Sequence, residues 1–164
     1  MRKKGFTLIE LIIVIAVIAI LAAAIFVAVD PARRLHETRN ARRWSDISTI
    51  LDAIKKYQVD NEGTHYFEIT SLTAGRLYMI GTSAGSCIAS CADSPTQSDC
   101  VDLSDIGANY LAVIPADPKD GTQEITGYAI QTAKSDDSIK VYACNPEAEG
   151  PGGSTDIPDI QVTR

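Results

Sequence analysis

The amino-acid sequence predicts an α+β fold: a long N-terminal helix, membrane-spanning and then amphipathic, packed on a small antiparallel sheet head with disulfide-held loops. Three observations predict it. An uncharged apolar run fills residues 11–29, apolar residues then recur at helical spacing to about residue 59, and the rest alternates strand-like segments with turns and holds all four cysteines. The predicted boundaries are 1–5 for a leader peptide, 6–29 for the apolar helix, 30–59 for the amphipathic helix, 60–144 for the globular head and 145–164 for a flexible tail.

Charge is divided unevenly along the 164 residues. Residues 1–56 hold 10 Lys or Arg and 5 Asp or Glu, whereas residues 57–164 hold 5 and 16, so balances of +5 and −11 make up the net charge of −6. The acidity of the second part argues against a general affinity for nucleic acid. The sequence therefore predicts a two-part molecule with no direct nucleic-acid binding.

The apolar run LIIVIAVIAILAAAIFVAV, residues 11–29, contains no Gly, Pro or charged residue. Extended back to Phe6, it would form a helix of about 36 Å at about 1.5 Å per residue, enough to cross a bilayer core. A cleavable secretory signal would fit the basic N-terminus, and a plain single-span anchor would fit the length. Both leave Glu10 unexplained, because a carboxylate near the centre of a span costs on the order of 3 kcal/mol and tends to mark function.

The residues on both sides of Gly5 carry a resemblance to a known family. A basic RKK stretch precedes Gly5, and FTLIE and the apolar run follow it; together they resemble the class III signal of type IV pilins and type II secretion pseudopilins over residues 2 to about 29. The resemblance implies that a membrane-embedded prepilin peptidase cuts after Gly5 on the cytoplasmic side and methylates the new amine of Phe6. The apolar segment is then retained, anchors the subunit in the inner membrane and later packs in the core of a helical filament.

Cleavage at this position would also give Glu10 a partner. The α-amino group of Phe6 would lie one helical turn before Glu10, at the i, i+4 spacing, and could pair with this carboxylate or with that of a neighbouring copy. At an effective dielectric constant of about 20, such charges roughly 4 Å apart attract by on the order of 4 kcal/mol before desolvation. In the family this glutamate pairs with a neighbour's N-terminus, so the resemblance implies an assembly role for Glu10.

The resemblance implies a structural function. The first interpretation is a subunit of a type IV pilus or pilus-like filament that serves surface attachment, motility or DNA uptake; the alternative is a type II secretion pseudopilin in protein export. Its partners would be the prepilin peptidase and methylase, other copies of itself and an inner-membrane assembly platform. The precursor would cross the inner membrane once, with its head outside the cytoplasm, before it joins a cell-surface pilus or a periplasmic pseudopilus. A third interpretation, from another class, is a secreted or anchored binding domain with an ordinary signal.

The helical pattern continues after Asp30 and Pro31, where the proline either kinks one helix or opens a second helix with Asp30 as its N-cap. Asn-Glu-Gly at 61–63 ends the pattern. The second half of the helix should pack on the sheet of the head through apolar residues at helical spacing: Leu35, Trp44, Ile47, Ile50, Leu51 and Ile54.

A basic band lies on the same helix, and two roles are open for it. It is either a solvated face with local pairs such as Arg33–Glu37, or a surface that faces the acidic heads of neighbouring subunits in a filament. The band consists of Arg33, Arg34, Arg39, Arg42 and Arg43.

All the cysteines lie in the acidic part of the chain. Four cysteines allow three full pairings, and the sequence does not select one. A zinc site would favour tighter pairs such as C-x2-C, whereas disulfides suit a small head outside the cytoplasm, so the sequence predicts disulfides. The candidates are Cys87, Cys91, Cys100 and Cys144.

The head is predicted to consist of short strands and turns. Residues 77–80 favour a strand or a piece between helix and loop, and residues 82–105 favour a loop held by disulfides. The clearest hairpin runs from 127 to 144 with its turn at 134–138, because apolar side chains alternate on both arms. Three prolines and three glycines favour a flexible or extended conformation for residues 145–164.

A second resemblance concerns LAVIPADP at residues 111–118, with Gly127 and Tyr128 further on, which is similar to a region of pseudopilin and some pilin heads. In major pseudopilins an acidic loop here binds calcium, but the aromatic and glycine residues usual after this proline are replaced by Lys-Asp-Gly. The alternative is turn residues on a solvated edge, and no other cofactor is expected. The calcium candidates are Asp117, Asp120, Asp136 and Asp137.

Signs of catalysis are poor. His36 lies in the arginine-rich helix, and His65 lies in a stretch that favours a loop. The sequence contains no evident Ser-His-Asp arrangement, glycine-rich phosphate loop or cluster of metal ligands. The chain is therefore predicted not to be an enzyme.

Overall fold

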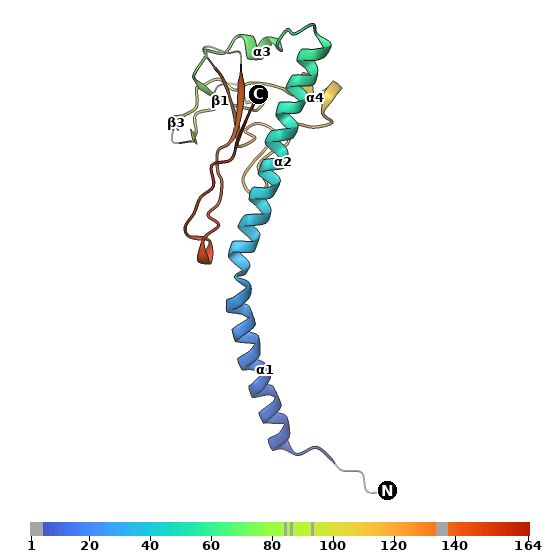
Figure 1. Ribbon diagram of the computed structural model, residues 1–164, viewed down its shortest axis with the longest axis vertical. Helices are drawn as coiled ribbons and strands as arrows, with labels where there is room; N and C mark the ends of the chain where they lie inside the picture. The colour runs from blue at the N-terminus through green and yellow to red at the C-terminus, as the bar shows by residue number, and fades with distance from the viewer. Residues whose placement is uncertain (1–4, 84, 86, 93, 134–137) are drawn as a thin grey trace.

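A computed structural model describes residues 5–83, 85, 87–92, 94–133 and 138–164. Figure 1 shows a long rod of two helices with a small head packed against the upper one, while the lower helix extends away from the head. This is the predicted α+β architecture. The basic leader residues 1–4 and the hairpin turn at 134–137 lie outside the described residues.

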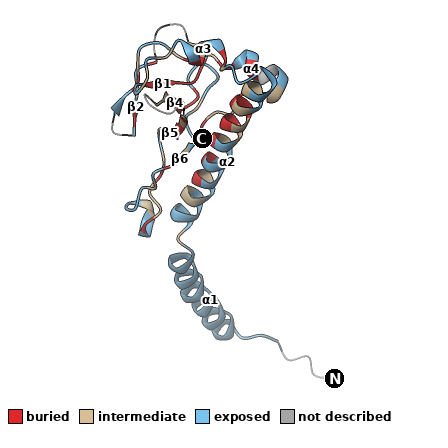
Figure 2. Ribbon diagram, turned by 45° about the horizontal axis from the view of Figure 1, so that its top comes forward, coloured by how far each residue is buried: buried red, intermediate tan, exposed pale blue. Residues whose placement is uncertain are grey.

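The first helix, α1, spans Leu8–Val29 and is capped at its N-terminus by Thr7. It is long and apolar enough to cross a membrane, and every one of its residues is exposed. Isoleucine, leucine, valine and alanine cover its whole circumference, so it lacks the polar face of an ordinary surface helix. Figure 2 shows α1 as a uniformly exposed rod, in contrast to the helix that follows it.

Asp30 separates α1 from the second helix, α2, which spans Pro31–Asp60. Its backbone adopts a left-handed conformation with φ of 45°, which breaks the helical hydrogen bonding, and its carboxylate accepts the Arg33 N–H at 3.4 Å. Pro31 occupies the first turn of α2, where its missing N–H costs nothing. Of the two alternatives left by the sequence, the structure therefore has a second, capped helix.

The head is built on one antiparallel sheet with strand order β1-β4-β5-β6. The predicted hairpin is confirmed, since Tyr128 pairs with Ala143 and Thr132 with Ile139. The strands of this sheet are Leu77–Met79 (β1), Tyr128–Thr132 (β4), Ile139–Ala143 (β5) and Gln161–Thr163 (β6). The remaining elements are the two-residue strands Ser90–Cys91 (β2) and Ser94–Pro95 (β3), the helices Phe67–Thr70 (α3) and Ser104–Tyr110 (α4), and the 3-10 turn Pro151–Gly153 (η1).

The core lies between α2 and the main sheet, where the apolar stripe of the helix meets the inner face of the strands (Figure 2). The prediction holds for the second half of α2 and is wrong for its beginning, because Leu35 and Trp44 are exposed. Polar Asn40 and Arg43 take the positions that face the head there. The buried residues that join the two layers are Ile47, Ile50, Leu51 and Ile54 of α2, with Tyr128, Ile130, Ile139 and Val141 of the sheet.

Two disulfides hold the loop between β1 and α4. The structure pairs Cys87 with Cys100, 13 residues apart, and Cys91 with Cys144, 53 residues apart. The first closes the loop on itself. The second ties it to the residue after β5, so the loop is anchored to the sheet.

The sequence predicts a flexible or extended conformation for residues 145–164, and the structure shows an extended segment that ends in a strand. β6 adds an edge strand to β5, and Ile160 is buried in the core. Pro151 and the three glycines form the turn that carries the chain down along α2 and back. A three-residue strand is too short to give a clear alternating pattern in the sequence.

Candidate functional site: the N-terminal segment and its support

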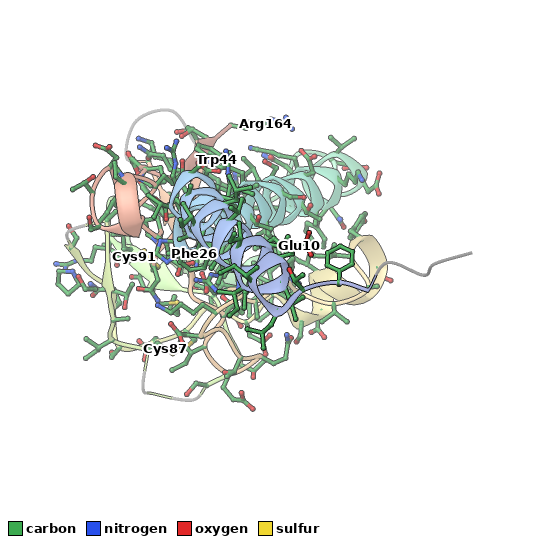
Figure 3. The ribbon with its side chains drawn as sticks, turned by 90° about the horizontal axis from the view of Figure 1, so that it is seen from below. Glu10, Phe26, Trp44, Cys87, Cys91 and Arg164 are labelled. Atoms are coloured by element: carbon green, nitrogen blue, oxygen red, sulfur yellow. A yellow bond between two sulfur atoms is a disulfide. The ribbon has the colours of Figure 1, made fainter. Side chains whose placement is uncertain are left out.

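The predicted cleavage site lies in an extended segment ahead of α1. No atom lies within 4 Å of where a Cβ on Gly5 would be, and the Phe6 side chain is 86% exposed. Among the described residues, nothing therefore covers the bond between Gly5 and Phe6. Figure 3 views the molecule from this end, with Glu10 at the start of α1.

Glu10 has a structural partner that the sequence analysis did not identify. Its carboxylate accepts the Thr7 backbone N–H at 2.8 Å and the Thr7 hydroxyl at 2.7 Å, and the Glu10 N–H donates to the same hydroxyl oxygen at 3.3 Å. Together these bonds form a capping box, which satisfies backbone donors at the start of the helix. The signal was present in the sequence as Thr-x-x-Glu directly before an apolar run.

The capping box places the carboxylate beside the N-terminal end of α1, where the helix dipole also favours negative charge. The same end would carry the α-amino group of Phe6 after cleavage. Glu10 therefore lies where it could contact a positive terminus of its own chain or of a neighbouring helix.

The head supports α2 through a buried cluster of charged side chains. The Arg43 guanidinium donates to both oxygens of Asp117, at 2.6 and 3.0 Å, and both side chains have no exposed surface. Arg39 donates to both oxygens of Glu147 at 2.5 and 2.6 Å, and Arg43 reaches Glu147 at 3.0 Å. Asn40 completes the cluster by bonding the backbone of Glu147.

Charge pairing lowers the pKa of both carboxyl groups in this cluster. Burial alone would raise the pKa of Asp117, but hydrogen bonds from Arg43 and from the Lys119 backbone N–H outweigh it and hold this pKa below its usual value. The bonds from Arg39, with a smaller contribution from Arg43, lower the pKa of Glu147 to about 2 against the opposing effect of burial. Both groups are therefore ionised at neutral pH.

This cluster corrects the interpretation of the basic band. Arg43 is part of the core, and Arg39 is half-buried against Glu147, so both guanidinium groups pair with carboxylates of their own head rather than forming a solvated face. Only Arg33, Arg34 and Arg42 remain exposed, and the local Arg33–Glu37 pair is present at 2.7 Å. These contacts could not be predicted from the sequence, because the acidic partners are far from α2 along the chain.

The calcium candidates do not form a site among the described residues. Both oxygens of Asp117 bond Arg43, and one of them also accepts backbone N–H groups, so a cation would have to displace a guanidinium. Within the described chain no group of three or more His, Cys, Asp or Glu side chains is placed to hold a metal. Asp136 and Asp137 lie outside the described residues.

The histidines have structural surroundings. His36 Nδ1 lies 2.8 Å from the carbonyl oxygen of Ala148 and is packed against η1, where a Cβ on Gly153 would lie 2.7 Å from the imidazole ring. His65 lies beside Gln58, 3.4 Å from its side-chain nitrogen.

The fold and the N-terminal segment together define a class: an α+β protein whose apolar N-terminal helix fits a membrane-anchored precursor. Residues 1–26 match the family model described as Prokaryotic N-terminal methylation motif. This motif is the class III signal of type IV pilins and pseudopilins, so the resemblance inferred from the sequence is confirmed, and the family that it marks is structural rather than enzymatic. No curated protein and no solved structure matched the chain.

Proposed function

We propose that the chain is a structural subunit of a type IV pilus or pilus-like filament, polymerised through α1. The observation that supports the proposal is the contrast between α1, which contains most of the matched signal, and α2, which follows it. α2 buries its apolar stripe on its own head, whereas α1 exposes apolar side chains around its whole circumference, with Glu10 as its one charged residue. Such a surface needs lipid or other apolar helices around it.

Processing prepares this helix for assembly. A prepilin peptidase cleaves after Gly5 and methylates Phe6, and the new positive terminus then meets Glu10 of the same or a neighbouring chain. Burying either charge alone among apolar helices would be costly, but burying both together offsets much of that cost. The pairing thereby favours the polymer over a subunit dispersed in the membrane.

The proposal also assigns partners and a location. Before assembly the precursor crosses the inner membrane once, with its head outside the cytoplasm, where its disulfides persist. The assembly platform in that membrane then transfers it into the filament, where copies of α1 replace the lipid. Attachment, motility and DNA uptake are jobs that such a filament serves.

Mass spectrometry of the mature N-terminus tests the proposal directly. We expect the protein from its native cells to begin at Phe6 and to carry an added methyl group. A chain that starts near Asp30 would instead indicate an ordinary secretory signal, and a chain that retains residues 1–5 would exclude processing; either result refutes the proposal.

The second candidate is a pseudopilin that forms a short periplasmic filament in protein export. The observation that favours it is the segment 111–118, which resembles pseudopilin heads and whose Asp117 anchors α2 in the structure. Electron microscopy separates the two candidates: long surface fibres favour the pilus, and filaments confined to the periplasm favour the pseudopilus. Calcium-dependent stability of the head would also favour the pseudopilin.

A further inference from the structure

The end of the head farthest from α1 carries an aromatic cluster. Tyr66 packs edge-on against Tyr57 and Phe67, with ring centroids 5.4 and 5.1 Å apart, and Tyr57 packs on Tyr110 at 6.0 Å. The Phe67 ring remains 64% exposed. Figure 1 shows α3 and α4, which supply Phe67 and Tyr110, beside the last turns of α2 at this distal end.

Carboxylates surround the aromatic cluster. Burial raises the pKa of Tyr66, and the negative charges of Asp105, Glu68 and Asp102 raise it further because they lie close to the ring. Asp60 lies close to the neighbouring Tyr110 in the same way. We call this surface the acidic distal face; it consists of Phe67 with Asp60, Glu62, Glu68, Asp102 and Asp105.

The beginning of α2 presents the opposite charge. Arg34 and Arg42 are 69% and 64% exposed, and Arg33 is 46% exposed. Glu37 and Asp46 pair with these side chains on one side, but each guanidinium carries five N–H donors and keeps part of them towards solvent. We define the α2 arginine face by Arg34 and Arg42, which lie about 80° apart around the helix at about 100° per residue, whereas Arg33 lies on the side opposite Arg42.

We propose that the acidic distal face of one copy binds the α2 arginine face of a second copy. The inference rests on the proposed filament function and names the contact between heads within it. The acidic distal face lies beside the C-terminal end of α2 and the α2 arginine face lies in its N-terminal half, so the contact is heterologous, and repeating it with an axial displacement generates an open helical array rather than a closed dimer. Guanidinium groups pair with carboxylates and also stack on exposed aromatic rings, which suits both components of the distal face.

The separation of the two faces sets the axial offset between the contacting copies. Asp60 follows Arg42 by 18 positions along α2 and Arg34 by 26 positions. At about 1.5 Å per residue, the second copy is displaced by about 27 to 39 Å along the α2 axis. A filament built through parallel α1 helices must therefore contain a pair of subunits with this displacement.

Charge exchange in the full-length protein, produced in its native cells, tests the contact. One variant combines Arg34→Glu with Arg42→Glu, a second combines Glu62→Lys with Glu68→Lys, and a third carries all four changes. We expect each double variant to lower filament abundance by about tenfold or more, because repulsion replaces attraction at every contact, and the fourfold variant to recover most of it.

Matched controls change the net charge equally at positions outside both faces, all exposed except the half-buried Lys140. Arg76→Glu with Lys140→Glu matches the first double variant, and Asp99→Lys with Asp120→Lys matches the second. Filaments are counted by electron microscopy, and the membrane level of each subunit is measured by immunoblotting so that a loss of filaments is assigned to assembly. Both control variants should assemble as the unchanged protein does.

Each outcome decides the proposal. Loss in both double variants with recovery in the fourfold variant supports the contact. Normal filaments from either double variant, failure of the fourfold variant to recover, or equal loss in the controls overturns it while leaving the filament function intact. Absence of filaments from the unchanged chain would instead refute the filament function, and with it the contact.

Discussion

The buried pair between Arg43 and Asp117 predicts a large loss of stability when one partner loses its charge. In Asp117→Asn the guanidinium stays fully buried but faces a neutral amide, with Glu147 as its remaining anionic contact at 3.0 Å. Breaking a buried ion pair costs about 3 to 5 kcal/mol of stability. Because Arg43 keeps its contact with Glu147, we expect Asp117→Asn to lose about 3 kcal/mol, the lower end of this range. That is a large fraction of the 5–15 kcal/mol typical of a folded domain.

The effect is measured by urea unfolding of the full-length chain in detergent micelles. The single tryptophan, Trp44, follows Arg43 directly in α2 and reports unfolding of this region by fluorescence. Arg34→Ala is the control, because the exposed pair that it removes contributes at most about 1 kcal/mol. A third variant, Arg43→Met with Asp117→Leu, should regain most of the stability since it leaves no buried charge from this pair.

Two results would refute this reasoning. One is an unfolding free energy for Asp117→Asn within about 1 kcal/mol of the unchanged protein, which is the range expected for an exposed pair. The other is a double replacement that is no more stable than the single one, which would show that an unpaired charge is not the cause of the loss.

Three further predictions concern acid, assembly and the disulfides. The free energy of unfolding should fall by up to about 3 kcal/mol as the pH drops from 4.5 towards 2. The reason is that folding lowers the pKa of Glu147 from 4.5 to about 2, so the ion pairs of Glu147 are complete only above this pH range. Urea titrations should show that Glu147→Gln removes this part of the acid dependence. Replacing Glu10 by Val should leave cleavage intact, as seen by mass spectrometry, but abolish filaments in micrographs; normal filament numbers would show that the carboxylate is dispensable. Removing the Cys91–Cys144 bond by paired Ser substitutions should cost about 4 kcal/mol in a chain-entropy estimate, against about 3 for the shorter-range disulfide, and an equal or reversed order in thermal unfolding would contradict that estimate.

The elements that follow from local pattern were predictable from the sequence. The apolar run, the helical repeat to about residue 59 and the alternating hairpin arms each depend on neighbours a few positions away, and all three are present in the structure. The N-terminal signal is local in the same sense, since its residues are contiguous. The capping box of Glu10 was equally local and could have been identified from its spacing to Thr7.

Contacts between distant segments could not be predicted. Arg43 and Asp117 are 74 residues apart, and an arginine in an amphipathic helix is ordinarily expected at the surface. The turn-rich composition of residues 145–164 likewise gave no indication that Glu147 pairs with Arg39 of α2 or that β6 adds the last strand of the sheet. The pairing of the cysteines was open for the same reason, because it depends on which loops the fold brings together.

The joint at Asp30 has a mechanical consequence. Its carboxylate also accepts the Gly152 N–H at 2.7 Å, and the nearby Gly153 rests against His36 in the second turn of α2. Tension on the anchor helix can therefore enter the head by two routes, through the backbone into α2 and across this bridge into the chain that leads to β6. A subunit pulled from its base would share the load between its longest helix and the last strand of its sheet.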